Sequence, residues 1–179
     1  FLQDKWNLTP RLALQLGARI SDYALHDNIY IDPRFGLKYI LRQDLSLKLS
    51  LGRFHQFLTI VNLEDESWQI VDFWMVLPED RLATWADHII LGLEYLSGDN
   101  WLFRAETYYK HFENLITLKQ GELFTEDEDQ LQFTPFNEFY DTRAYAYGLE
   151  LLVKKTAGRI RGWVGYTYAE TNRHIKKHG

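Results

Sequence analysis

The sequence contains no cysteine, and this absence excludes a disulfide framework and any metal site built from thiolates. It also has no run approaching the roughly 18 consecutive apolar residues that a transmembrane helix needs. Any contact with a membrane must therefore be made by β-strands. The Gly-x-Ser-x-Gly signature of many serine hydrolases is absent as well. We therefore expect that the chain is not an enzyme and that it binds neither a metal ion nor a cofactor.

Alternation of apolar and polar residues is the main positive feature of the chain. Every second residue is apolar over residues 12–20, and every second residue is leucine over residues 45–51. This period of two is typical of β-strands with one apolar and one polar face. Similar segments recur along the chain, and their connections are alternately short and long. A soluble β-sandwich has no reason for that rhythm, whereas a transmembrane β-barrel has short turns at one end and long loops at the other.

We predict an all-β fold, an antiparallel up-and-down meander of about seven long strands that forms part of a transmembrane β-barrel. Residues 6–10 are expected to lead into the first strand. The turn Gly98-Asp99-Asn100 should pair Leu93 with Ala105 and Glu94 with Arg104. The predicted strands are Pro10–Tyr23, Pro33–Leu41, Leu45–His55, Ala86–Leu96, Trp101–Leu118, Arg143–Lys154 and Arg159–Asn172.

Charge is distributed unevenly between the strands and the long connections. The chain carries a net charge of −5, while residues 56–84 sum to −5 and residues 119–141 sum to −6, so the remainder is +6. The long loops are therefore acidic and the barrel wall is basic. A short acidic segment, 125–130, could hold Ca²⁺, but it lacks the glycine and the ligand spacing of a calcium loop, which favours a solvated loop.

Charged residues on the polar face of the strands are candidates for lining a solute path or contacting a domain inside the barrel. The alternative is a hydrated wall held by salt bridges. Lys38 and Lys48 should lie opposite each other, which is costly unless an anion, or a carboxylate of that inner domain, lies between them. We therefore prefer this pair as the contact with the domain inside the barrel. The candidates are Arg19, Lys38, Lys48, Glu94, Arg104, Glu106, Lys110 and Glu150.

Aromatic residues make up 16% of the chain, a high share. Several fall near strand ends or on the apolar face, where aromatic girdles meet the lipid interface; packing in a soluble core is the alternative. The girdle candidates are Trp6, Tyr95, Trp101, Tyr145, Trp163, Tyr166 and Tyr168. In the first long connection, Trp68, Phe73 and Trp74 could stack on a sugar or a planar chelate, or pack within the loop.

Short phrases recur in a characteristic order along the strands. They include Leu8-Thr9-Pro10-Arg11, Asp32-Pro33-Arg34-Phe35-Gly36-Leu37-Lys38-Tyr39, Leu51-Gly52-Arg53-Phe54, Gly92-Leu93-Glu94-Tyr95, Gly148-Leu149-Glu150 and Gly165-Tyr166-Thr167-Tyr168-Ala169. In their order and spacing, over nearly the whole chain, they resemble the TonB-dependent outer-membrane receptors. The resemblance implies a 22-stranded barrel of the outer membrane, filled by an N-terminal plug domain.

By this resemblance, the partners are outer-membrane lipid, the plug, the energy-transducing TonB protein and a scarce nutrient such as an iron chelate, corrinoid, saccharide or peptide; no nucleic acid is expected. We find no plug, energy-coupling box or closing strand, so we expect residues 1–179 to be a single partial barrel domain, truncated at both ends. A plugless porin shares every strand feature. A soluble lipocalin-like binding protein and an outer-membrane lipase completed by other strands are further alternatives.

Overall fold

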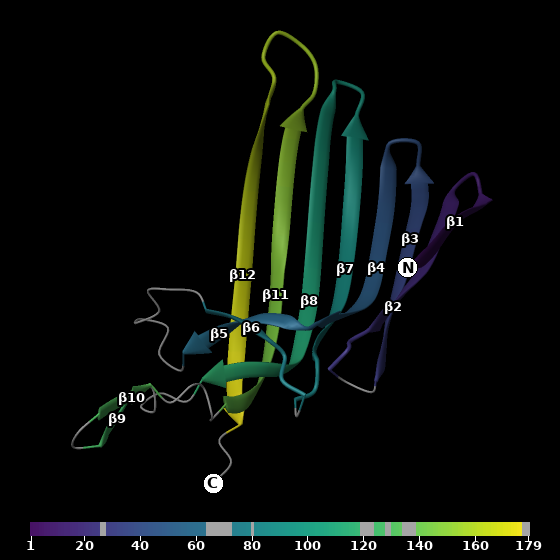
Figure 1. The fold of residues 1–179 in the computed structure, drawn as a ribbon. Helices are drawn as coiled ribbons and strands as arrows, with labels where there is room; N and C mark the ends of the chain where they lie inside the picture. Colours follow the sequence, from purple (N-terminus) through teal and green to yellow (C-terminus); the bar gives the residue numbers. More distant parts are fainter. Residues whose placement is uncertain are drawn as a thin grey trace.

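The computed structural model describes residues 1–25, 28–63, 73–79, 81–118, 124–127, 130–133 and 139–176, and in these ranges all regular elements are β-strands. The strands are β1 (Leu2–Thr9), β2 (Leu12–Asp22), β3 (Ile29–Arg42), β4 (Leu45–Gln56), β5 (Leu58–Leu63), β6 (Phe73–Val76), β7 (Thr84–Ser97), β8 (Trp101–Leu118), β9 (Phe124–Asp127), β10 (Gln130–Phe133), β11 (Phe139–Lys155) and β12 (Gly162–Lys176). Eight of them form one antiparallel meander in the order β1-β2-β3-β4-β7-β8-β11-β12 (Figure 1). The predicted all-β meander is confirmed.

The meander has one more long strand than the sequence pattern predicts. β1 pairs with β2 over most of its length, with Trp6 opposite Leu14, whereas the pattern predicts only a segment that leads into the first strand. Alternation in β1 is interrupted, because Asp4 occupies a position on the same side as Leu2 and Trp6. The other seven strands overlap their predicted ranges, with differences at their ends. β3 and β11 each begin four residues earlier than predicted, at Ile29 and Phe139, and β12 begins three residues later and ends four residues later than predicted, at Gly162 and Lys176.

The two long connections contain strands of their own. β5 and β6 form an antiparallel pair within the first, and β9 and β10 form a separate two-stranded sheet within the second. The end of β5 also pairs in parallel with the end of β8, Asn62 opposite Thr117. These four strands lie at the lower end of the meander in Figure 1, and the short turns lie at its upper end. The first connection therefore folds back onto the sheet.

The register of the strands agrees with the predicted pairs. Leu93 lies opposite Ala105, and Glu94 lies opposite Arg104. Lys38 lies opposite Lys48 across the β3–β4 pair. These pairings follow from the short turns, because a turn of fixed length sets which residues of a hairpin face each other.

One row of side chains crosses the whole meander and shows how the faces separate. Directly opposed residues, strand by strand, are Trp6, Leu14, Leu37, Leu49, Leu91, Thr107, Leu149 and Tyr168. Side chains alternate between the two sides of a strand, so every second row shares this face. We name it the apolar face. It is exposed in the chain alone: Leu91 is 43% exposed and Leu149 is 40% exposed.

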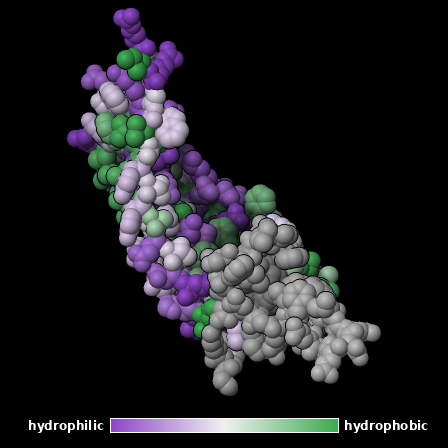
Figure 2. Space-filling model, turned by 90° about the vertical axis from the view of Figure 1, so that its left-hand side faces the viewer, coloured by the Kyte–Doolittle hydropathy of each residue, from purple (hydrophilic) through white to green (hydrophobic). Residues whose placement is uncertain are grey.

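The opposite side of the meander, which we name the polar face, is crossed by rows of charged and small residues. One row contains Lys38, Lys48, Gly92, Glu106 and Glu150 on successive strands. In Figure 2, which looks along the sheet from the β12 edge, much of the hydrophobic colour lies along one margin and hydrophilic residues lie beside it. Such a sheet is amphipathic across its thickness.

A small hydrophobic core lies at the end of the meander that carries the long connections. Leu77, Ala83 and Ile116 are almost completely buried, and Tyr23 and Phe57 pack against them. The Tyr23 hydroxyl donates to the Leu77 carbonyl at 2.8 Å, and the Tyr23 and Phe57 rings stack with centroids 4.7 Å apart. These contacts fix the first long connection to the β2–β3 end of the sheet.

Candidate functional site

The polar face holds all of the predicted wall residues. Arg19 lies opposite Asp32 between β2 and β3, and Lys110 lies opposite His88 between β7 and β8. The other candidates occupy the same side of β3, β4, β7, β8 and β11, by register. The structure thus brings them together on one surface. Their orientation toward the lumen of a closed barrel stays a prediction.

Three of these side chains form a closed ionic network. Glu94 Oε2 accepts from Lys48 Nζ at 3.0 Å and from Arg104 Nη2 at 2.9 Å and Nε at 3.2 Å. The Glu94 side chain is only 16% exposed. Lys48 lies directly opposite Gly92, so Glu94 reaches it diagonally from the next polar position along β7. Lys48 therefore has a carboxylate partner within the sheet. The predicted contact of the Lys38–Lys48 pair with a domain inside the barrel stays a prediction.

Glu106 and Glu150 lie directly opposite each other on β8 and β11. Like charges at such positions are unfavourable. Glu106 bends away across the sheet, because its Cγ and Oε1 lie 3.3 Å from the position that a Cβ would occupy on Gly92. The missing side chain of Gly92 thus provides the space into which one of the two carboxylates withdraws.

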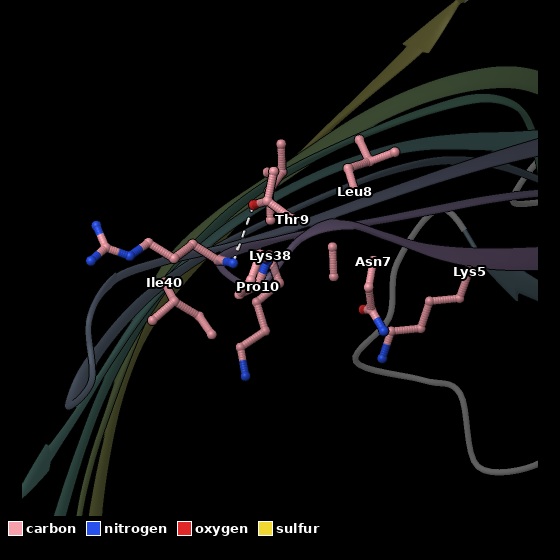
Figure 3. Close-up of a pocket in the computed structure, with 10 residues that line it drawn as sticks. Lys5, Asn7, Leu8, Thr9, Pro10, Lys38 and Ile40 are labelled. Carbon is pink, nitrogen blue, oxygen red and sulfur yellow. Dashed lines mark hydrogen bonds between the residues drawn. The ribbon is translucent and has the colours of Figure 1, made fainter.

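A basic hollow lies at the end with the short turns, between β1, β2 and β3. It has a volume of about 610 Å³, and its polar lining includes Lys5, Asn7, Arg11 and Lys38. Lys5, Asn7 and Lys38 project to the inner side of the curve that the ribbons make, whereas Leu8 projects to the other side (Figure 3). The Arg11 backbone N–H donates to Thr9 Oγ1 at 3.2 Å and so closes the β1–β2 turn.

Lys5 is absent from the predicted wall residues because the sequence pattern does not identify β1 as a strand, and Arg11, within the predicted first strand, is not among the candidates. A signal is nevertheless present: Leu2, Trp6 and Leu8 share one side of the segment, and Lys5 lies on the other. In the described part of the chain, no carboxylate pairs with Lys5, Arg11 or Lys38. The basic hollow is therefore electrostatically unbalanced, unlike the Glu94 network.

The aromatic candidates divide between the two faces. By register, Trp6, Tyr95, Trp101, Tyr145, Tyr166 and Tyr168 lie on the apolar face. Trp163 is different: it lies opposite Lys154, on the polar face, with its ring 3.5 Å from the position of a Cβ on Gly165. Trp163 is still at a strand end and 71% exposed. Their contact with a lipid interface stays a prediction.

The loop candidates are only partly described. Trp74 lies in β6 and is 62% exposed. Phe73 begins β6, and its backbone pairs with Val61. Trp68 lies outside the described residues, as does part of the acidic segment 125–130.

The described residues contain no helix that is long and apolar enough to cross a membrane. No group of three or more His, Cys, Asp or Glu side chains in these ranges is arranged to hold a metal ion. His88 and His111 lie on opposite faces, as their positions in β7 and β8 predict, and no catalytic pair is formed between them.

Comparison with known proteins gives a match over almost the whole chain. A family model described as "TonB dependent receptor-like, beta-barrel" matches residues 1–177. No curated protein matches the chain. The solved structure of the siderophore receptor PirA from Pseudomonas aeruginosa is similar, with a TM-score of 0.68 and 16% sequence identity. The match covers 97% of this chain and 34% of that chain, so this chain spans about a third of that structure. At this identity the likeness concerns the fold.

Proposed function

The chain belongs to the TonB-dependent receptor-like β-barrel family, whose barrels lie in the outer membrane, and from this premise we propose that it forms part of the wall of a receptor that takes up a scarce nutrient. One observation carries the proposal: the apolar row from Trp6 on β1 to Tyr168 on β12 crosses all eight strands of the meander. An exposed apolar surface of this extent needs lipid around it.

We further propose that a plug domain of the full-length protein contacts the polar face. Its surface carries unbalanced charge in two places, namely the cations of the basic hollow and the opposed carboxylates Glu106 and Glu150. A plug that meets this wall is expected to offer a carboxylate to Lys38 and a cation to the glutamate pair, because buried charges require partners.

The nutrient itself is expected to meet the long-connection end first. Trp74 supports this, because a largely exposed tryptophan is well suited to stacking on a planar or sugar-like ligand. The family also implies that the TonB protein supplies energy through the plug. No chemistry on the nutrient is assigned to these residues.

The experiment is an uptake assay with the full-length receptor in its own outer membrane. Radiolabelled iron chelates, a corrinoid, an oligosaccharide and a peptide are offered to cells with and without the receptor gene, and with and without the inner-membrane energy complex. Uptake of one of these nutrients should require both the receptor and the inner-membrane energy complex. Uptake that needs the receptor but continues without the energy complex, with rates set by solute size, would instead identify a porin.

A further inference from the structure

A second hollow lies on the polar face, farther from the short turns than the Glu94 network. It has a volume of about 240 Å³ and is bordered by strands β1, β2, β3, β4 and β7. Its lining includes the small residues Gly36, Ser50 and Gly52 and the larger side chains of Arg34, Phe54 and His88. The Phe54 ring lies over Gly52, 3.0 Å from the position of a Cβ there, so the open part of the floor is at Gly36 and Ser50.

The Arg34 guanidinium at this hollow has an aromatic neighbour in place of an acidic one. The guanidinium carbon of Arg34 lies 4.9 Å from the centroid of the Phe54 ring, and the Phe54 and His88 rings are 4.7 Å apart. His88 lies opposite Lys110, which adds a further positive charge to the same row. Within the described residues, neither Arg34 nor His88 forms an ion pair with a carboxylate.

The surroundings of Arg34 differ from those of the cations in the Glu94 network. There the sheet supplies its own carboxylate to two cations at 2.9–3.0 Å. At Arg34 the sheet instead supplies an aromatic ring, which holds the guanidinium in place without neutralising it. The remaining guanidinium N–H groups are free to form a bidentate contact with a carboxylate.

From this geometry we propose that the hollow binds a flat anionic group, an aromatic or similarly planar unit that carries a carboxylate. The carboxylate lies against Arg34, and the plane lies beside Phe54 and over Gly36 and Ser50. The volume of about 240 Å³ is smaller than the roughly 300–1,000 Å³ of sites for complete small ligands. The hollow therefore accommodates one arm of a larger solute.

This inference rests on the proposed function only in requiring that the polar face be directed to the interior of the barrel and that the plug, proposed to contact it at the basic hollow and at Glu106 and Glu150, leave this second hollow accessible. The probe is 4-fluorobenzoate, titrated by ¹⁹F NMR into the full-length receptor in detergent. 4-Fluorobenzamide lacks the charge, and fluoroacetate lacks the ring. We expect benzoate to bind at least fivefold more tightly than either. Arg34→Gln should weaken benzoate binding at least fivefold, and Phe54→Leu should reduce the preference over fluoroacetate.

Arg42→Gln is the matched control, because Arg42 lies next to a short turn, bonds to Asp44 and is outside the hollow. It should leave benzoate binding unchanged. Heat-modifiable migration in gel electrophoresis checks that each variant contains a folded barrel.

A second measurement identifies an occupant from the receptor's own chain. In the Arg34→Lys variant, a carbodiimide joins an adjacent carboxylate to the new amine, and mass spectrometry of tryptic peptides locates the link. A link to an aspartate or glutamate of the receptor, together with absent benzoate binding, would show that the receptor's own chain fills the hollow and would overturn the proposal. The proposal is also wrong if benzoate selectivity is absent without such a link, or if Arg34→Gln leaves selective binding intact. Energy-dependent uptake that persists in that case leaves the proposed function standing.

Discussion

Replacement of Leu91 by arginine tests whether the apolar face is surrounded by lipid. On β7, Asp87 and Ser97 share this face and are ten residues apart. At roughly 3.4 Å per residue and a strand tilt of about 40°, they are separated by about 26 Å along the barrel axis, close to the apolar band of about 25 Å in outer-membrane barrels. Asp87 is bonded to Arg53 at 2.7 Å, as expected at a polar border. Leu91 lies near the centre of the band.

An arginine at the midplane of a transmembrane barrel costs about 2–4 kcal/mol. We therefore expect Leu91→Arg to lower the free energy of unfolding of the full-length receptor by about 3 kcal/mol, measured by equilibrium denaturation in lipid vesicles. Leu82→Arg is the control, because Leu82 is 67% exposed and lies outside the strands; its effect should stay within about 0.5 kcal/mol. Equal effects of the two substitutions would refute a lipid-facing position for Leu91.

Three further substitutions test the interior of the sheet by the same denaturation assay. Gly148→Ala should cost about 1–3 kcal/mol, because a Cβ there would lie 2.6 Å from a backbone carbonyl, whereas Gly98→Ala, with nothing within 4 Å, should be close to neutral; equal costs would contradict this. Glu94→Gln should cost about 1–2 kcal/mol, because it leaves two cations without a carboxylate, and Asp44→Asn in an exposed pair should cost less than about 1 kcal/mol. Asn114→Ala should cost about 1–2 kcal/mol, since Asn114 has a φ of 56° and its amide donates to a carbonyl at 3.2 Å; a neutral result would show that this bond and backbone conformation are unimportant.

Seven of the eight strands of the meander, and the pairing within their hairpins, could be predicted because both depend on local sequence; β1 is missed because Asp4 interrupts its alternation. Alternation determines the faces and the short turns determine the register, so the Lys38–Lys48 and Glu94–Arg104 pairs follow from the amino-acid sequence alone. Each of these pairs belongs to a single hairpin. A hairpin brings together residues that are close in the sequence, and a turn of known length leaves little freedom in their pairing.

Contacts that join several hairpins could not be predicted in the same way. The bond between Lys48 and Glu94 crosses from β4 to β7 over a long connection of unpredicted geometry. The cluster of Arg34, Phe54 and His88 needs the register of three strands at once. Neither the length nor the composition of a long loop specifies how the strands on its two sides align. For this reason the sequence identifies the polar face but not its two hollows.

Apolar side chains are removed from water in two different ways along the strands. Across the meander, leucines such as Leu91 remain about 40% exposed, so their burial depends on lipid. At the long-connection end the chain buries Leu77 and Ile116 almost completely and joins the Thr117 and Thr142 hydroxyls at 2.9 Å. Burial of this kind removes apolar groups from water without lipid. Under the proposed function, the change from exposed to buried apolar groups along the strands is therefore expected at the border of the membrane, on the side of the long connections.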